Sequence, residues 1–510
     1  MHTDKTIFIT GATGLVGGLL ALRALAAGFH LRLLVRGSVN FSAKERIRQV
    51  FSFLGMPQEE WGVVRDRVEL VPGDVTLRRF GLTIDAWQQA AENLQAVFHA
   101  AAYTGFDRSQ VEKSVAVNID GTRHVLKFVE QARTARYFHI STAYIVGDSR
   151  ERIFEEPQNG PFPWKNPYEK TKCLAEQEVH GYCRQKGLNA TVFRPAILIG
   201  DSRSGRTIRF NNIYNFIRVA HALSRRRSRQ PVIIEAKATA RLNIVPVDFA
   251  VDTIWDVSQL AQSGGKIFHI TNPSPPSFVE LVEAYSRILD LNIQCIDPSD
   301  RNCPDNPAKG RRIGAAFSEY GEYMFGEPEF DLSRSRALLA DYDTRFPSLD
   351  EEYYRKILDF AVAKNWGNRQ QAPPAIVPKT RETTYAERYF KEFLPAKLHK
   401  QLLSNLKNLN GIVAIHFRDM VGPDWMLELR DGMLTAISQN SLVPECTYDT
   451  ALATFETVAR GLARPEQVFF DGDADILGDI EKGLQVITAL SEFFRSYPFN
   501  PREQLAVPQQ

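Results

Sequence analysis

The chain has 510 residues, of which 44% are hydrophobic and 24% are charged, and its formal net charge is +2. This length exceeds one ordinary hydrophobic core, so we expect a globular protein of more than one domain. The balanced charge gives no reason to expect nucleic acid as a partner, and no uninterrupted apolar run approaches the roughly 20 residues of a transmembrane segment.

The cysteines and the N-terminal residues indicate the cellular compartment in which the protein is expected. The five cysteines are scattered and contain no Cys-x-x-Cys pair, which favours reduced thiols in a cytoplasmic protein and suggests neither a disulfide frame nor a metal site. The N-terminus leads directly into an expected strand at residues 7–9, which leaves no room for a signal peptide.

A glycine loop follows this first strand and precedes a helical run at residues 19–27. Its three glycines, Gly11, Gly14 and Gly17, let the backbone turn sharply, let a pyrophosphate approach the main chain and let the helix pack closely on the strand. A glycine turn without a ligand is the alternative. The strand before the loop and the helix after it favour a dinucleotide site.

The next expected strand, residues 31–35, ends at Arg36, where the adenosine ribose of a nicotinamide cofactor lies in this type of fold. An acidic residue there would bind the 2′-hydroxyl of NAD, whereas an arginine pairs with a 2′-phosphate. Arg36 therefore favours NADPH, although a surface arginine without a role is the alternative. Expected helices and strands then alternate through residues 43–54, 67–75, 96–102, 117–130 and 137–142, which predicts a doubly wound parallel sheet, a Rossmann fold.

Tyr168 and Lys172 stand four residues apart in an expected helix that runs to about Lys186, so they share one helix face. An ammonium group ~6 Å from a phenolate, at an effective dielectric constant of ~20, stabilises it by roughly 3 kcal/mol, or about two pKa units. Tyr168 would then be a proton donor near neutral pH. A chance Tyr-x-x-x-Lys pair is the alternative.

Together these motifs resemble those of a known enzyme superfamily. The glycine loop, residues 118–122, residues 141–143 and the Tyr168–Lys172 pair follow one another as in the extended short-chain dehydrogenases/reductases. Within that superfamily the chain resembles the thioester reductases, which include the terminal reductase domains of carboxylic acid reductases and nonribosomal synthetases and have fatty acyl-CoA reductases as relatives. The likeness covers residues 1 to about 365 and extends to residues 34–36, 73–75, 80–82, 99–101, 194–205 and 242–248.

The resemblance implies roles for the site residues. Thr142 would hydrogen-bond the substrate carbonyl, Tyr168 would protonate its oxygen, and Lys172 would hold the nicotinamide ribose and lower the tyrosine pKa. Asn118 would support the proton relay of the lysine or brace the sheet. Ser141 is the alternative to Thr142, because neighbouring strand residues face opposite sides.

The resemblance also implies NADPH as the cofactor. Besides Tyr168 and Lys172, its contacts would be Thr10, Gly11, Thr13, Gly14, Leu15, Val16, Gly17, Arg36, Asp74, Val75, Ala100, Ala101, Ala102 and Pro195. His99 and His139 lie in apolar strands and are expected to be core histidines.

The substrate-binding part is expected mainly from residues 201–230 and 272–365, outside the sheet, with one more strand at residues 264–272. A basic run at residues 225–229 would meet an acidic carrier protein or coenzyme A phosphates, or would be a solvated loop. We expect the reductase domain to span residues 1–367 and a proline-containing linker to span residues 368–380.

A second, α+β domain is expected at residues 381–500. It would begin with an amphipathic helix at residues 385–406 and continue with strands at residues 411–417 and 425–437, the latter turning at Asp431-Gly432, and with helices near residues 455–461, 465–470 and 479–494. This part resembles sterol-carrier-protein type 2 domains, which implies a hydrophobic lipid ligand. A packing or dimerisation domain with a filled core is the alternative.

The combined prediction is an NADPH-dependent reduction of an acyl thioester, bound to a carrier protein or to coenzyme A, to the aldehyde, with a second hydride giving the alcohol. One alternative is a reductase or dehydrogenase of a free ketone, alcohol or sterol. Another is a lipid-binding protein whose reductase fold only senses the cofactor. A nucleotide-sugar epimerase is disfavoured, because residues 193–200 lack the Arg-Tyr and Gly-Pro pattern of that group.

Overall fold

The computed structural model describes residues 5–37, 42–106, 108–133, 136–149, 151–210, 213–225, 232–237, 239–297, 311–312, 323, 326–339, 345–367, 385–399, 410–420, 422–439, 442–471, 473–478 and 480–500. The chain forms two compact units. The first unit comprises Met1–Arg209, Lys237–Leu281 and Glu322–Phe360, and the second comprises Phe210–Ala236, Val282–Gly321 and Ala361–Gln510. Across the described residues no helix combines the length and apolar composition that crossing a bilayer requires.

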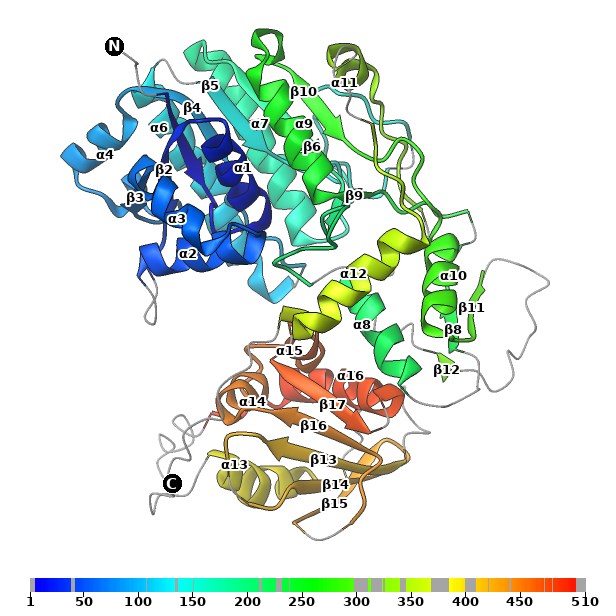
Figure 1. The fold of residues 1–510 in the computed structure, drawn as a ribbon. Coiled ribbons are helices and arrows are strands. Elements are labelled where there is room, and N and C mark those ends of the chain that lie inside the picture. The colour runs from blue at the N-terminus through cyan, green and yellow to red at the C-terminus, as the bar shows by residue number, and fades with distance from the viewer. Residues whose placement is uncertain are drawn as a thin grey trace. The chain divides into compact units, whose positions relative to one another are not determined.

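A seven-stranded parallel sheet is the centre of the first unit (Figure 1). Its strands, in spatial order, are β10 (Ile267–Ile270), β6 (Ala190–Pro195), β5 (Arg136–Ile140), β4 (Leu94–His99), β1 (Thr6–Thr10), β2 (His30–Val35) and β3 (Val68–Pro72). The chain runs outward in one direction from β1 to β3 and in the other from β4 to β10. This order confirms the predicted doubly wound fold, and it places the switch point, where such sheets bind ligands, between β1 and β4.

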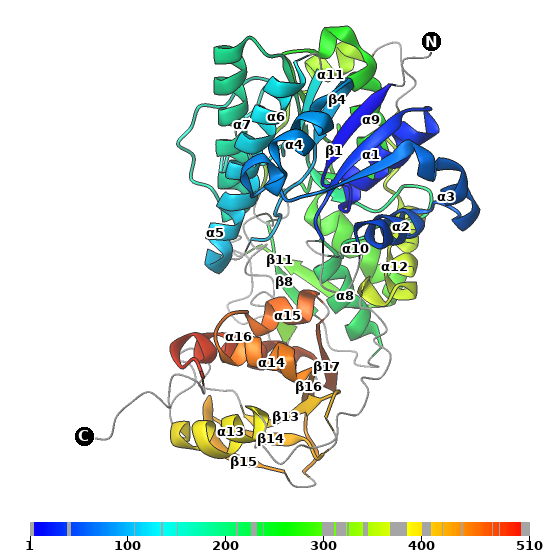
Figure 2. The same ribbon diagram turned by 90° about the vertical axis from the view of Figure 1, so that its left-hand side faces the viewer.

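Helices cover both faces of this sheet (Figure 2). One face carries α1 (Leu15–Ala26), α2 (Ala43–Leu54) and α9 (Val247–Gln259), and the other carries α4 (Ile84–Ala91), α6 (Gly121–Ala132) and α7 (Pro167–Lys186). Side chains of β1 alternate between two apolar cores, with Ile7 and Ile9 in one core and Phe8 in the other. Shorter elements of this unit are α3 (Gln58–Val64), β7 (Ile197–Ile199), β9 (Ile244–Pro246) and α11 (Ser333–Leu338).

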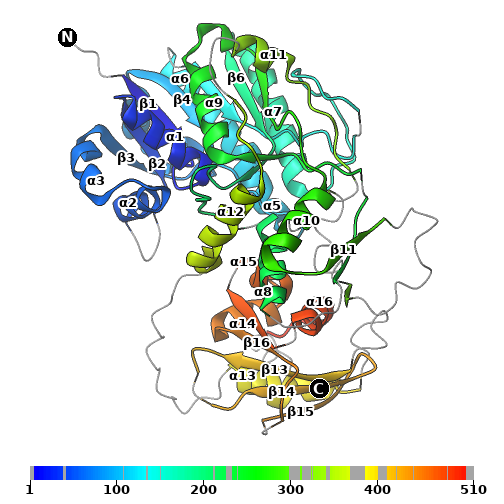
Figure 3. The same cartoon turned by 45° about the vertical axis from the view of Figure 1, so that its right-hand side comes forward.

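A five-stranded mixed sheet forms the centre of the second unit, in the order β15 (Met433–Ser438), β14 (Trp425–Arg430), β13 (Gly411–Phe417), β16 (Cys446–Thr450) and β17 (Ala474–Gly478). The helices α14 (Leu452–Ala459), α15 (Pro465–Asp471) and α16 (Ile480–Ser496) accompany it (Figure 3). The predicted Asp-Gly hairpin is confirmed, since Asp431 and Gly432 join β14 to β15 with φ values of +51° and +74°. Strand β17 was not predicted.

The helix predicted over residues 385–406 is wrong in its continuity. The structure has α13 (Tyr385–Arg388), a π-helical turn η9 (Tyr389–Phe393) and a short 3-10 turn η10 (Leu394–Lys397). Pro395 lacks the amide that a continuing α-helix needs, which explains the change of helix type. Residues 400–406 lie outside the described residues, as do the predicted linker 368–380 and most of the basic run at 225–229.

Further segments of the second unit come from the middle of the chain, namely α8 (Ile213–Ser224), β8 (Val232–Glu235), β11 (Ile293–Ile296) and β12 (Arg311–Arg312). The buried Arg218 of α8 donates to the carbonyl oxygen of Phe469 at 2.9 Å and pairs with Asp475 at 2.8 Å. Helices α10 (Phe278–Leu289) and α12 (Glu351–Ala363) each contain a division between the units. The two units are therefore interleaved in sequence, and the predicted domain division at residues 367 and 381 stays a prediction.

Candidate active site

The glycine loop is pressed against the segment that follows β4. A Cβ atom added to Gly11, whose φ is +75°, would lie 2.5 Å from the amide nitrogen of Ala101 and 2.6 Å from the carbonyl carbon of Ala100. A Cβ at Gly17 would lie 2.4 Å from the Gly11 carbonyl oxygen. Only glycine fits at these two positions, because the obstructing atoms belong to the backbone.

Helix α1 begins at Leu15 directly after this loop, and its N-cap residue, Gly14, makes no side-chain capping hydrogen bond. The amides of its first turn therefore point toward the loop without a protein side chain to satisfy them, which is the usual arrangement for a phosphate at a helix N-terminus. The predicted contact residues Thr13, Leu15 and Val16 lie in this turn or just before it. The loop thus fits the pyrophosphate of a dinucleotide.

A buried hydrogen-bond chain fixes the floor of the site. The Thr10 hydroxyl lies 2.7 Å from Nδ1 of His99 and accepts from the Ala101 amide at 3.3 Å. Nε2 of His99 lies 3.1 Å from the Thr122 hydroxyl, which itself donates to the Asn118 carbonyl oxygen at 2.6 Å. Since Thr122 uses its proton on that carbonyl, His99 carries its own proton on Nε2 and accepts at Nδ1.

His99 and His139 are buried core residues, as their sequence context suggested. Burial lowers the pKa of His99 to about 3 and holds the pKa of His139 well below its ordinary value. Tyr137 shares a hydrogen bond of 3.1 Å with Nδ1 of His139. Both imidazoles are therefore neutral and hold the strand ends in place.

Two arginines lie at the end of β2. The Arg36 side chain is 60% exposed, with its guanidinium 3.7 Å from Asp74, and Arg46 on α2 donates to the Arg36 carbonyl oxygen at 2.6 Å. Asp74 accepts from the amide and the hydroxyl of Thr76, both at 2.9 Å, so its carboxylate also orders the loop after β3. Sequence reasoning missed Arg46, although its place in the first turns of the helix after β2 could have signalled it.

Val75 and Pro195, two further predicted cofactor contacts, lie at or after the ends of sheet strands and not in the glycine loop. Val75 is buried, and a Cβ atom on Gly121 would lie 3.2 Å from it. Pro195 ends β6, and its carbonyl oxygen accepts from the Ala143 amide at 2.9 Å. Both residues shape the edge of the sheet at which the strands end.

The predicted catalytic residues gather beyond the C-terminal end of β5. Helix α7 starts with the Asn166 side chain accepting from the Glu169 amide at 3.0 Å, followed by Pro167 in the first turn. Tyr168 is half-buried and is hydrogen-bonded to Thr142. Lys172 is buried one turn further along, and its Nζ donates to the Ile140 carbonyl oxygen at 2.6 Å.

The pKa of Tyr168 differs from the prediction. Burial raises it to about 12, the hydrogen bond from Thr142 lowers it, and the nearby Glu169 carboxylate raises it further. Burial also lowers the pKa of Lys172 to about 8. The predicted lowering by Lys172 is therefore absent here, because the prediction counted the attraction between two charges but not the loss of solvent around both groups.

Asn118 and Ser141 occupy distinct positions. Asn118 lies in a π-helical turn, η4 (Val115–Asp120), where it accepts from the Tyr103 amide at 2.8 Å and donates to the Tyr103 carbonyl at 3.0 Å and to the Thr171 hydroxyl at 2.9 Å. It thus ties the loop after β4 to α7. The buried Ser141 hydroxyl has no hydrogen-bond partner among the described residues, whereas Thr142 faces Tyr168.

A half-buried carboxyl group, that of Glu327, was missed by sequence reasoning. Glu327 accepts from the Tyr144 hydroxyl at 2.8 Å and from the Asn243 amide at 2.7 Å, and burial raises its pKa to about 7. The ring of Phe106 stacks against both Tyr168 and Tyr323 with centroid distances of 6.1 Å. The position of Tyr144 directly after the Ser-Thr-Ala motif is the signal that could have pointed to this cluster.

Two family models match separate stretches of the chain. Residues 9–254 match a nicotinamide-dinucleotide-binding family model described as Male sterility protein. Residues 390–491 match the SCP-2 sterol transfer family. The first match contains the glycine loop and the Thr142, Tyr168 and Lys172 group, and the second contains the five-stranded sheet.

Individual relatives are of two kinds. The chain is 26% identical over 301 residues to the nonribosomal peptide synthetase asaC of Aspergillus flavus, covering 57% of this chain and 28% of that protein. It is 26% identical over 294 residues to the fatty acyl-CoA reductase wat of Drosophila melanogaster, covering 51% of this chain and 55% of that protein. The chain thus matches 28% of the length of the first of these relatives and 55% of the second.

Solved structures share the fold. The terminal R domain from the myxalamid PKS-NRPS biosynthetic pathway has a TM-score of 0.60 at 24% identity, covering 71% of this chain and 91% of that domain. A thiolation-reductase di-domain from an archaeal non-ribosomal peptide synthetase has a TM-score of 0.57 at 18% identity, covering 72% of this chain and 76% of that one.

Proposed function

The chain joins an extended short-chain dehydrogenase/reductase domain of the thioester reductase and fatty acyl-CoA reductase type to an SCP-2 sterol transfer domain, and from this premise we propose that it reduces an acyl thioester with NADPH. The acyl group would arrive on coenzyme A or on a carrier protein and leave as the aldehyde, or as the alcohol after a second reduction. The observation that carries the proposal is the gathering of Thr142, Tyr168 and Lys172 at the edge of the sheet that also bears the glycine loop.

Two features support NADPH. The glycine loop and the uncapped first turn of α1 would hold the pyrophosphate. Arg36 and Arg46 bring two guanidinium groups to the end of β2, where a 2′-phosphate would lie. The cofactor, when bound, supplies the hydride.

The protein side chains supply the proton and the orientation. The Thr142 hydroxyl would donate to the thioester carbonyl oxygen, and Tyr168 would give its phenolic proton to that oxygen as the carbon becomes tetrahedral. Lys172, whose Nζ donates to the Ile140 carbonyl oxygen, would hold the nicotinamide ribose beside Tyr168. Asn118 would keep α7 against the loop after β4 and so hold Tyr168 in place.

The tetrahedral hemithioacetal then collapses. Its C–S bond breaks, the oxygen returns its proton to Tyr168, the aldehyde forms and the sulfur leaves as the thiol after taking a proton. No net proton is left on the protein, so each turnover consumes one hydride and one proton.

A reductase or dehydrogenase of a free ketone, alcohol or sterol is the second candidate, since it would use the same three side chains. The sterol transfer domain is the observation that favours it. A pure cofactor sensor is less well supported, because a sensor has no use for the hydrogen-bonded pair Thr142 and Tyr168.

The test is NADPH oxidation by the purified full chain with coenzyme A thioesters, ketones and sterols. Tyr168→Phe is expected to lose about 100-fold or more of its thioester turnover while its melting temperature stays within a few degrees. Tyr182→Phe is the matched control, because Tyr182 lies on the same helix and its hydroxyl bonds Glu130. Unchanged turnover in Tyr168→Phe would contradict the mechanism, and oxidation with ketones alone would select the second candidate.

A further inference from the structure

Three aromatic rings from separate parts of the first unit lie beside one another at the candidate site. Tyr168 comes from the first turn of α7, Phe106 from the loop after β4, and Tyr323 from a segment much further along the chain. The Phe106 ring centroid lies 6.1 Å from that of each of the other two rings. Its plane is inclined by only 28° to that of Tyr168 and by 26° to that of Tyr323, so Phe106 stacks on both.

Tyr323 is fixed to the start of α7. Its hydroxyl donates to the Glu169 carboxylate at 2.5 Å and accepts from the Asn166 side-chain amide at 2.9 Å. The Lys165 ammonium lies 4.4 Å from its ring centroid, a distance at which a cation is attracted to an aromatic face. The residue is only 8% exposed. Its ring is therefore a firm support for an aromatic neighbour.

The loop that carries Phe106 is attached to α7 as well. The Asn118 side chain accepts from the Tyr103 amide at 2.8 Å and donates to the Tyr103 carbonyl oxygen at 3.0 Å. The same side chain donates to the Thr171 hydroxyl on α7 at 2.9 Å. The loop and the helix that bears Tyr168 are therefore joined at two places, through Asn118 and through the stacked rings.

The Phe106 and Tyr168 rings leave no room for a carbon atom between them. Carbon atoms in contact lie about 3.5–4.0 Å apart, so an atom held between two rings needs about 7 Å between their planes. The centroid distance of 6.1 Å sets an upper limit on that separation at the ring centres. A substrate group that extends toward Phe106 therefore meets a closed aromatic surface.

The reacting end of a substrate has to come close to this surface. Phe106 and Tyr168 are both half-buried, so an edge of each ring stays open. A hydrogen bond of ~2.7 Å and a C=O bond of ~1.2 Å place a bound carbonyl carbon within about 4 Å of the Tyr168 phenolic oxygen. Carbon 2 of the acyl group lies one bond further, and its substituents extend beside the two rings.

We propose that Phe106 sets which acyl groups the reductase accepts, namely those that are unbranched at carbon 2 or branched there in one configuration only. A straight chain carries two hydrogens on carbon 2 and passes along the open ring edges. A branch directed at Phe106 would have to displace a ring that Tyr323 and the attached loop hold in place. This inference rests on the proposed function, because it takes the carbonyl to bind at Tyr168.

The experiment compares kcat/KM of the full chain, with saturating NADPH, for hexanoyl-coenzyme A and for the (R) and (S) forms of 2-methylhexanoyl-coenzyme A. The two branched forms have the same intrinsic reactivity, so the ratio between them reports the protein alone. In the unaltered chain one form is expected to be at least about 10-fold slower than the other, the usual effect of one methyl group without room. Phe106→Ala should bring this ratio to within about twofold of one by accelerating the slower form.

A matched control separates selection from general damage to the fold. Phe154→Ala removes a phenylalanine that is 51% exposed, and it should leave the ratio unchanged. Damage to the fold lowers the turnover of all three thioesters together and does not move the ratio. If Phe106→Ala loses all turnover, Phe106→Leu decides, because it keeps a hydrocarbon side chain but removes the ring, and it should also lower the ratio.

Two results would overturn the inference. One is a ratio near one in the unaltered chain, and the other is an unchanged ratio in Phe106→Ala or, where that variant is inactive, in Phe106→Leu. Failure of the proposed function looks different. Absence of turnover with hexanoyl-coenzyme A overturns the reductase assignment and this inference with it, whereas turnover without discrimination at carbon 2 overturns the inference alone.

Discussion

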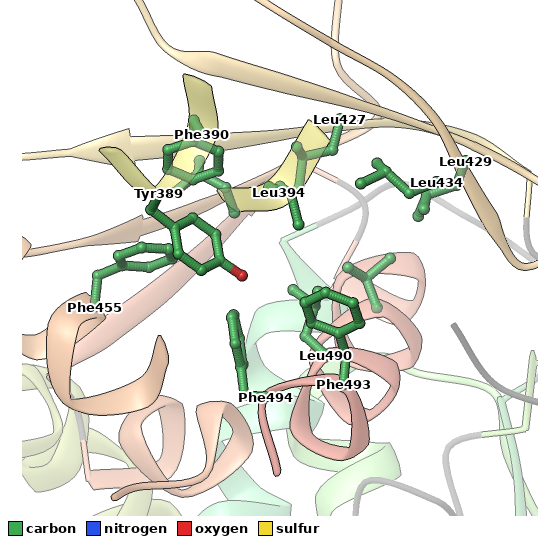
Figure 4. A pocket seen from close by; sticks show the side chains of 12 residues that line it. Tyr389, Phe390, Leu394, Leu427, Leu429, Leu434, Phe455, Leu490, Phe493 and Phe494 are labelled. Carbon is green, nitrogen blue, oxygen red and sulfur yellow. The ribbon is translucent and has the colours of Figure 1, made fainter. Parts of the chain in front are cut away.

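The candidate site of the first unit and the small cavity between the sheet and the helices of the second unit differ in the polarity of the side chains around them (Figure 4). In the first unit Thr142, Tyr168, Lys172 and Glu327 each have a hydrogen-bond partner within the protein. In the second unit the side chains around the cavity are hydrocarbon, apart from that of Tyr389. The first arrangement can position and protonate a reacting group, whereas the second offers hydrocarbon contacts and no charged group.

The largest expected effect tests whether the cavity lining carries the stability of the second unit. Phe390→Ala removes a ring that stacks on Trp425 at 4.8 Å and lies 5.5 Å from Phe455, and it should cost about 3–5 kcal/mol of unfolding free energy. Urea denaturation measures this loss. The Kd for NADPH should not change, and a parallel loss of cofactor binding would show that the two regions are not separable.

The next prediction concerns the glycine loop. Gly11→Ala places a methyl group on the backbone of Ala100 and Ala101, so NADPH binding measured by fluorescence titration should weaken about 100-fold or more, which corresponds to about 2.7 kcal/mol. Gly28→Ala is the matched control, because Gly28 also has positive φ, at +87°, but no atom lies within 4 Å of the added methyl. Retained binding in Gly11→Ala would remove the loop from the cofactor site.

A smaller effect should appear as a pH dependence of stability. The pKa of Glu327 is about 7 in the folded chain against an ordinary value of 4.5, so the folded chain holds this proton more tightly than the unfolded chain does. The folded state therefore loses stability as pH rises from about 4.5 to 7, and the loss is complete above that range.

Glu327→Gln removes this dependence. Its melting temperature, relative to that of the unaltered chain, should be higher at pH 8 than at pH 5 by a few degrees, equivalent to about 1–3 kcal/mol. Glu329→Gln is the control, since that side chain is 72% exposed. Equal shifts at both pH values would mean that Glu327 is charged throughout.

The smallest prediction concerns cofactor choice. Arg36→Ala and Arg46→Ala should each reduce the preference for NADPH over NADH about tenfold, because each removes one charge from the end of β2. Ratios of kcat/KM for the two cofactors measure this. Arg32→Ala is the control. Arg32 lies on β2 and its guanidinium pairs with Glu69, so its loss should leave this ratio unchanged.

Local patterns were predictable and distant juxtapositions were not. The glycine loop and the Tyr168 and Lys172 pair depend on spacings of three and four residues, so the sequence alone indicates their geometry. Glu327 reaches Tyr144 from more than 180 residues away, and no local pattern encodes that contact. The shift in the Tyr168 pKa also escaped prediction, because its direction depends on burial by the folded surroundings.

The second unit shows the same limit. The Asp431-Gly432 turn was predicted because a two-residue hairpin needs positive φ at both positions. Strand β17 was missed, since it is short and lies between two helices. Hydrophobic periodicity through residues 385–406 suggested one helix, and it gave no sign of the π-helical turn that begins at Tyr389.

The contact of Arg218 with Phe469 and Asp475 limits how this protein can be dissected genetically. A gene truncated after residue 367 would still encode α8 but would remove both partners of a buried guanidinium. Loss of activity in such a fragment would then report a damaged fold and say nothing about lipid binding. Point substitutions in the full chain are therefore the way to assign separate roles to its two units.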